Sequence, residues 1–188
     1  ISLNFVINAY ILTMFVQTEI TPNPNSLKFL PGKTVSNDGS FEVTKKEDTD
    51  NELIRNLLSI NGVTGVFLGV DFLSINKTEN MDWEEIKHIA ISLINDFYSS
   101  GKKFVIKSSL FKENNSELIE IEKKIIKILD TKIRPAVAKD GGDIKFKEYK
   151  DGIVKVELQG SCSGCPSSTM TLKQGVQNLL CHYLPEVK

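Results

Sequence analysis

The chain has 188 residues, and 23 Lys and Arg stand against 24 Asp and Glu, so its formal net charge is −1. With 40% hydrophobic and 25% charged residues, it has the composition of a globular protein rather than a disordered or fibrous one, and its length suits one large domain or two small ones. The balanced charge gives no electrostatic reason to expect nucleic acid as a partner, and two histidines with three cysteines exclude both imidazole-rich zinc sites and a dense disulfide framework.

Residues 1–13 are apolar but carry Asn4 and Asn8 and no charged side chain. A secretory signal needs a positive start, a transit peptide needs arginines, and a membrane helix needs about 20 apolar residues, so none of these is predicted. We expect an upstream extension here, with Met14 as the natural start. The cysteine usage favours a reducing intracellular compartment, and the lack of a transit peptide favours a bacterial cytoplasm over a mitochondrial matrix.

A first domain is predicted over residues 14–106. Its expected elements, in chain order, are short strands at 15–20 and 26–30, a helix at 52–60, a hairpin of strands at 63–68 and 72–76, and an amphipathic helix between Asp82 and Gly101. The segment Thr21-Pro-Asn-Pro-Asn25 separates the first two strands, and its prolines require a turn or a rigid corner. Asp82 with Glu85 resembles a capping box for the last helix.

Residues 107–116 are polar and lack a sustained period, so they predict a linker. A second domain is predicted over 117–188. Its expected elements are a helix at 117–133 that Pro135 ends, a hairpin of strands at 144–149 and 153–158 turned by Asp151-Gly152, and a helix at 166–183. The predicted fold class is therefore α+β, with two small domains and a C-terminal module of helix-strand-strand-helix order that carries a cysteine loop before its last helix.

The sharpest chemical signal is the motif Cys162-Ser-Gly-Cys165, at the start of the last predicted helix. Its spacing allows both sulfurs to face one metal centre or to form a disulfide. The unpaired N–H groups and the positive dipole end of a helix start favour thiolate over thiol. Gly160 and Gly164 allow the backbone to approach a bound group closely.

Two thiols are half of a metal site, because zinc and iron–sulfur centres usually take four protein ligands. Cys181 is the remaining thiol, but a continuous helix places it about 24 Å from Cys165, so we expect a partly exposed structural thiol. A complete site then needs two chains, each giving one pair at its surface. Two alternatives stay open, a dithiol oxidoreductase that uses Cys162 and Cys165 and a zinc-stapled dimer, although the module is too short for a thioredoxin-like sheet.

Four segments of the chain carry a resemblance to a known family. Residues 130–143, 151–152 and 158–169 closely resemble the NifU-like C-terminal domain of Nfu iron–sulfur proteins, and residues 21–29 resemble the Nfu N-terminal signature. The resemblance covers about residues 14–187 and implies a non-enzymatic scaffold or carrier. Such a protein holds a [4Fe–4S] cluster between two protomers, with [2Fe–2S] open as an assembly stage, and passes it to client apo-proteins.

The same resemblance implies Cys162 and Cys165 as the cluster ligands. The implied partners are a second copy of the chain, client apo-proteins and upstream assembly factors, with no nucleic acid and no membrane. The first domain carries no ligand set, so we expect it to recognise partners or to tune the module. Asp140-Gly-Gly-Asp143 resembles a metal or phosphate loop, but two carboxylates without further ligands favour a tight turn.

Overall fold

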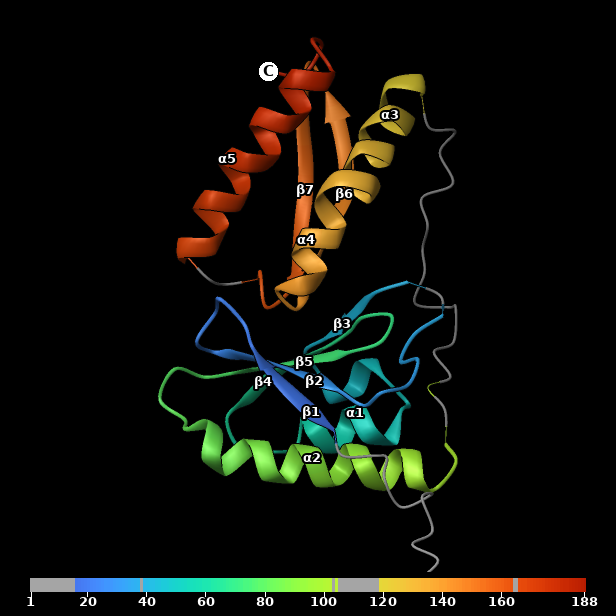
Figure 1. Cartoon of the computed structure of the whole chain (residues 1–188), viewed down its shortest axis with the longest axis vertical. Helices are drawn as coiled ribbons and strands as arrows, with labels where there is room; N and C mark the ends of the chain where they lie inside the picture. Colours follow the sequence, from blue (N-terminus) through green and yellow to red (C-terminus); the bar gives the residue numbers. More distant parts are fainter. Residues whose placement is uncertain (1–15, 38, 103, 105–118, 164–165) are drawn as a thin grey trace, which may run out of the picture.

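The fold is that of a computed structural model, which describes residues 16–37, 39–102, 104, 119–163 and 166–188 (Figure 1). The predicted linker at 107–116 and the predicted start at Met14 lie outside these residues. We refer to residues 16–104 as the N-terminal half and to residues 119–188 as the C-terminal half. Each half has a hydrophobic core of its own, while the exact domain boundaries stay a prediction.

In the described residues, the N-terminal half forms a five-stranded antiparallel sheet of order β1-β2-β5-β4-β3. The strands are β1 (Gln17–Ile20), β2 (Ser26–Leu30), β3 (Phe41–Val43), β4 (Val63–Leu68) and β5 (Leu73–Lys77). Two helices, α1 (Glu52–Leu57) and α2 (Trp83–Ser99), cover one face of this sheet (Figure 1). A short 3₁₀ helix, Lys46–Asp48, precedes α1.

The alternation of side chains along β5 shows which face is which. Leu73 and Ile75 point into the core under the helices, while Ser74 and Asn76 lie on the opposite face. We call this second side the open face of the sheet, because neither α1 nor α2 covers it. The open face is nevertheless shielded from solvent, since Ser74 is 0% exposed.

The C-terminal half is a two-stranded hairpin packed against helices. Its elements are α3 (Glu120–Ile128), a π-helical segment (Leu129–Ile133), α4 (Arg134–Lys139), β6 (Gly142–Lys150), β7 (Ile153–Gly160) and α5 (Pro166–Tyr183). Asp151 and Gly152 turn the hairpin with φ of 51° and 86°, as a two-residue loop with a right-handed strand twist requires. The predicted hairpin and last helix are confirmed, and so is the α+β fold class.

Two local predictions were wrong, and one strand was not predicted. Pro135 does not end the helical path: the chain passes through the π-helical segment into α4, since a wider turn accommodates a residue without an N–H. Strand β3 was not predicted, because its three residues are too few to show the two-residue period of a strand. Helix α1 ends at Leu57 rather than at Ile60.

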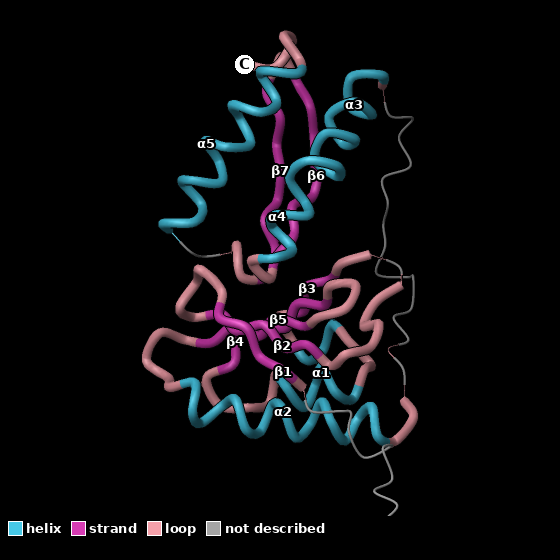
Figure 2. Tube along the Cα trace, viewed as in Figure 1, coloured by secondary structure: helices cyan, strands magenta, loops and turns pink. Residues whose placement is uncertain are grey.

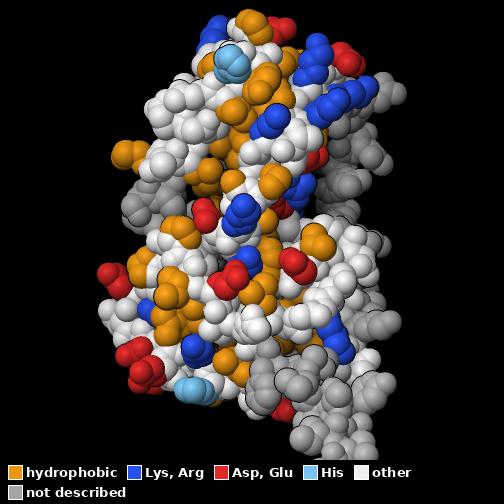
Figure 3. Space-filling model, viewed as in Figure 1, with side chains coloured by type: hydrophobic (Ala, Val, Ile, Leu, Met, Phe, Trp, Pro, Cys, Tyr) orange, Lys and Arg blue, Asp and Glu red, His pale blue; other side chains and the backbone are white. Residues whose placement is uncertain are grey.

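The two halves meet end to face. The α4–β6 and β7–α5 connections lie at the end of the C-terminal half that is next to the N-terminal sheet (Figures 1 and 2). Strand β7 lies within contact distance of β3, β4 and β5. On the face seen in Figure 3, acidic and basic side chains lie near one another at this junction. Within the described part of the chain, no helix has the length and apolar character needed to cross a membrane.

Candidate functional site

Cys162 lies in the connection from β7 to α5, two residues after Gly160, where the strand ends with φ of +68°. Its side chain is 5% exposed and belongs to the core of the C-terminal half. Gly164 and Cys165 lie outside the described residues, so the pairing of Cys165 with Cys162 stays a prediction. We call residues 160–163 the cysteine loop.

The burial of Cys162 corrects the expectation that its thiol lies at the protomer surface. The sulfur fills space that Gly142 leaves empty at the start of β6, since a Cβ atom on Gly142 would lie 2.8 Å from Cys162 Sγ. The Ser161 hydroxyl lies 3.9 Å from the same sulfur. A thiol in this position must turn outward before it can bind an exposed metal centre.

The Asp140-Gly-Gly-Asp143 segment is a tight turn, as predicted. Gly141 adopts φ of +82° between α4 and β6, and its carbonyl accepts a hydrogen bond from Ser161 N at 3.1 Å. The Ser161 hydroxyl also donates to the Asp140 carbonyl. These bonds join the turn to the cysteine loop, so the two segments form one continuous surface.

Asp143 is buried at the junction of the two halves, and its carboxylate accepts several hydrogen bonds. Its carboxylate accepts from Arg134 at 2.8 and 2.6 Å, from Ile144 N at 2.8 Å and from the Ser40 hydroxyl of the N-terminal half. Burial alone disfavours the charged carboxylate. The donors outweigh this effect and hold the pKa of Asp143 below its usual value, and the same pairing raises the pKa of Arg134.

Replacing Asp143 by asparagine should lower the free energy of unfolding at pH 7 by about 2 kcal/mol, because charge-assisted hydrogen bonds are lost. A carboxyl group whose folded pKa lies below its unfolded value of 3.8 stabilises the fold above that pH. This stability is lost as pH falls through the lowered pKa. Urea unfolding from pH 7 to pH 2 should therefore show the gap between wild type and Asp143→Asn closing in acid.

Asp130 supplies the matched control. It also bonds Arg134, at 2.9 Å, but its side chain is 46% exposed, so Asp130→Asn should change the stability by less than about 0.5 kcal/mol. If the difference in unfolding free energy between wild type and Asp143→Asn stays constant down to pH 2, the role given to the ionised carboxylate is contradicted.

Side chains of the N-terminal half bond the cysteine loop and its neighbouring turn. Asn23 Nδ2 donates to Ser161 O at 2.9 Å, and Asn76 Nδ2 donates to Gly160 O at 3.2 Å. Gly160 N donates to Glu42 Oε1 at 3.2 Å, and Ser74 Oγ donates to Gly141 O at 2.6 Å. Sequence reasoning missed these residues. For Ser74 and Asn76 the available signal was a polar side chain at every second position of a strand, and this pattern is typical of a solvated face.

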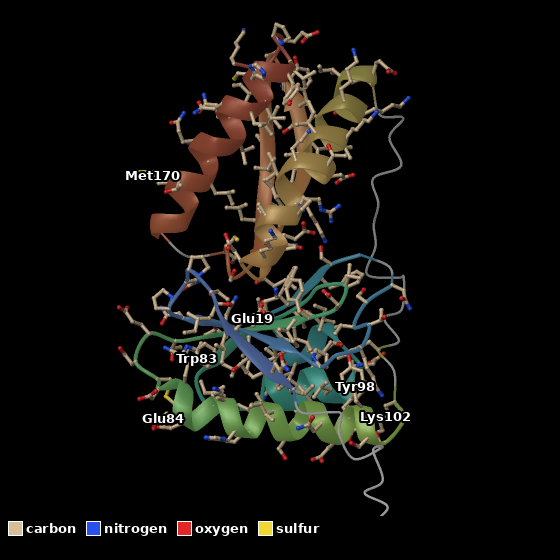
Figure 4. All side chains as sticks on the ribbon, viewed as in Figure 1. Glu19, Trp83, Glu84, Tyr98, Lys102 and Met170 are labelled. Carbon is tan, nitrogen blue, oxygen red and sulfur yellow. The ribbon has the colours of Figure 1, made fainter. Side chains whose placement is uncertain are left out.

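The Thr21-Pro-Asn-Pro-Asn25 segment is a turn, as predicted, and it presents Asn23 to the cysteine loop. Asn23 is 7% exposed, and its Oδ1 accepts from Asn25 N at 3.0 Å, which fixes the side chain. Trp83, at the start of α2 (Figure 4), donates from Nε1 to Pro24 O at 2.9 Å. The turn is therefore held on both sides.

Glu42 is the titratable group of the N-terminal half that bonds the cysteine loop directly. Burial raises the pKa of its carboxyl group; the Gly160 N–H opposes this shift, and the charge of Glu157 adds to it. Burial between the two halves therefore disfavours the ionised form of the Glu42 carboxyl group.

Cys181 is partly exposed in α5 and packs at the margin of the C-terminal core, which confirms its predicted placement, while its structural role stays a prediction. In residues 16–163 and 166–188, apart from positions 38, 103 and 105–118, no three Cys, His, Asp or Glu side chains converge into a group that could hold a metal ion.

Comparisons with known proteins match both halves. A family model described as "NifU-like domain" matches residues 125–188, and one described as "Scaffold protein Nfu/NifU N terminal" matches residues 16–101. The human protein "NFU1 iron-sulfur cluster scaffold homolog, mitochondrial" is 46% identical over 178 residues, which are 93% of this chain and 70% of that protein. The Arabidopsis thaliana "NifU-like protein 4, mitochondrial" is 42% identical over 186 residues, which are 94% and 65%.

The chain thus spans about two thirds of the length of these curated relatives. Among solved structures, a NifU-like protein from Saccharomyces cerevisiae matches with 26% identity and a TM-score of 0.46, covering 50% of this chain and 86% of that one.

Proposed function

Because this chain belongs to the Nfu family of iron–sulfur cluster scaffold proteins, we propose that it holds an iron–sulfur cluster as cargo and passes it to client apo-proteins. The observation that carries the proposal is the position of Cys162, which lies in the β7–α5 connection, four residues before the start of an 18-residue helix. A thiol near the positive end of a helix dipole ionises more easily and becomes a ligand for iron.

Cys162 and Cys165 are the proposed ligands, and one chain supplies two thiolates of the four that a cluster takes. Cys181, the remaining cysteine, lies near the end of α5 at the margin of the C-terminal core, which supports a site that two chains share. We therefore propose a [4Fe–4S] cluster bridging a homodimer, with [2Fe–2S] as an assembly stage.

Release of the cargo needs no oxidation or reduction by this chain. Each client thiolate takes the place of one cysteine on an iron, and the displaced cysteine leaves as a thiolate that can be protonated. Because the ligands come from two chains, separation of the chains removes half of the donor set in one step. We accordingly propose a carrier and not an enzyme.

The relatives are named as mitochondrial proteins. The expectation of a bacterial cytoplasm has no support from these comparisons, and we propose a mitochondrial location. The proposed partners are a second copy of the chain, client apo-proteins and the factors that load the cluster.

Anaerobic reconstitution of the whole chain with iron and sulfide tests this function. We expect about four irons and four sulfides per two chains and a holo-protein of twice the chain mass by native mass spectrometry. A holo-form with one chain per cluster, saturated without an added thiol, would contradict the shared site. A colourless chain that reduces insulin disulfides would replace the carrier by a dithiol oxidoreductase.

A further inference from the structure

The open face of the N-terminal sheet is covered, although several of its residues, such as Ser74, Asn76 and Lys28, are polar or charged. Ser74 and Phe67 are 0% exposed and Lys28 is 8% exposed. What covers them is the C-terminal half, through the Gly141 turn and the cysteine loop. A polar face becomes buried at low cost only when its donors and acceptors find partners.

The partners are backbone atoms of the cysteine loop and the adjoining turn. Both Gly160 N and Gly160 O are bonded by the N-terminal half, and so is Ser161 O. The recognised feature is the backbone shape of the loop and turn, because Asn23, Asn76 and Glu42 contact carbonyl and amide groups.

Glycines make this close approach possible. A Cβ atom on Gly141 would lie 2.8 Å from Ser74 Oγ, and one on Gly160 would lie 2.9 Å from Phe67 Cγ. Both distances are too short for a side chain. The sheet face and the loop are therefore complementary in shape as well as in hydrogen bonding.

We propose that the open face of the N-terminal sheet is a binding surface for the cysteine loop of its own chain, and that it keeps Cys162 from reacting until the two halves separate. Cys162 is 5% exposed, and the backbone just before it is bonded at Gly160 and Ser161. On this proposal, these bonds hold the loop in the conformation that turns the thiol inward. On the proposed function, cluster loading by two chains then requires the same separation, because a second chain must approach the loop.

The test measures alkylation of Cys162 in a full chain that carries Cys165→Ser and Cys181→Ser, which leaves one thiol. Asn23→Asp with Asn76→Asp places carboxylates against Ser161 O and Gly160 O, while the carboxylate introduced at position 23 can still accept from Asn25 N. We expect iodoacetamide to modify Cys162 at least about tenfold faster in this variant, because two hydrogen bonds that oppose opening are lost.

Asn56→Asp with Asn80→Asp is the matched control, since it makes the same charge change at two exposed positions. Its alkylation rate should stay within about twofold of the parent, as expected of surface substitutions. Equal rates in the two double variants would overturn the proposal. Circular dichroism of both variants shows whether the fold is kept.

Hydrogen exchange on the wild-type chain decides the question if the interface variant fails to fold. The Gly160 amide, whose acceptor is Glu42 Oε1, should exchange slowly; exchange at the rate of an unstructured amide would overturn the proposal. The outcomes are separate from those of the proposed function. If the wild-type chain takes up a cluster shared by two chains but the interface variant is alkylated no faster than the parent, only the proposed binding surface is wrong. If the interface variant is alkylated faster as expected but the wild-type chain takes up no cluster, only the proposed carrier function is wrong.

Discussion

Replacing Cys162 by serine is expected to lower the iron bound after reconstitution to less than about a tenth of the wild-type amount, because a neutral hydroxyl does not replace a thiolate on iron. The loss should be equally large in a dimer, since two chains would then lack two of four ligands. Iron and sulfide counts per chain, with the visible absorption of the cluster, measure it.

Two controls separate ligand loss from damage to the fold. Cys162 is part of the C-terminal core, so a buried serine should cost about 1–2 kcal/mol of unfolding free energy, which urea unfolding detects. Cys181→Ser changes a partly exposed thiol in α5 and should keep the wild-type iron content. Equal loss of iron in both variants would overturn the assignment of the ligand.

Local patterns in the sequence predicted the elements on which the site depends. The pattern of residues 72–76 predicted the strand that is β5, Asp151-Gly152 predicted the β6–β7 turn, and Pro166 suits the first position of the helix predicted at 166–183. Each of these signals acts within a few residues, through backbone φ preference or the two-residue period of a strand. Local physics is sufficient at these places because no distant segment competes with it.

Contacts between distant segments could not be predicted in this way. The strand period places Ser74 on a solvated face, yet its hydroxyl bonds Gly141 O, 67 residues further along the chain. Cys162 lies in a Gly/Ser loop that is typical of a surface, yet Gly142 leaves the space that buries its sulfur. Both outcomes depend on how the halves and loops pack, which no local period describes.

Gly160→Ala is expected to lower the free energy of unfolding by about 3 kcal/mol or more, since overpacking adds to backbone strain. Gly160 has φ of +68°, and an added Cβ would lie 2.6 Å from Gly141 O, 2.9 Å from Gly142 Cα and 2.9 Å from Phe67 Cγ. Two of these atoms are backbone and the third belongs to a ring that is 0% exposed. None of them can move away cheaply.

Comparison with Gly101→Ala isolates the steric part of this cost. Gly101 has nearly the same φ, +72°, but no atom of the described residues lies within 4 Å of its added Cβ, so only the left-handed strain of about 1 kcal/mol remains. Urea unfolding of both variants gives the difference. Because Phe67 belongs to the N-terminal half and Gly160 begins the cysteine loop, Gly160→Ala should also speed exchange of the Asn76 side-chain amide protons, whereas Gly101→Ala should not. Equal destabilisation by the two substitutions would show that the loop does not pack tightly on the sheet, and the proposed binding surface would then have no steric basis.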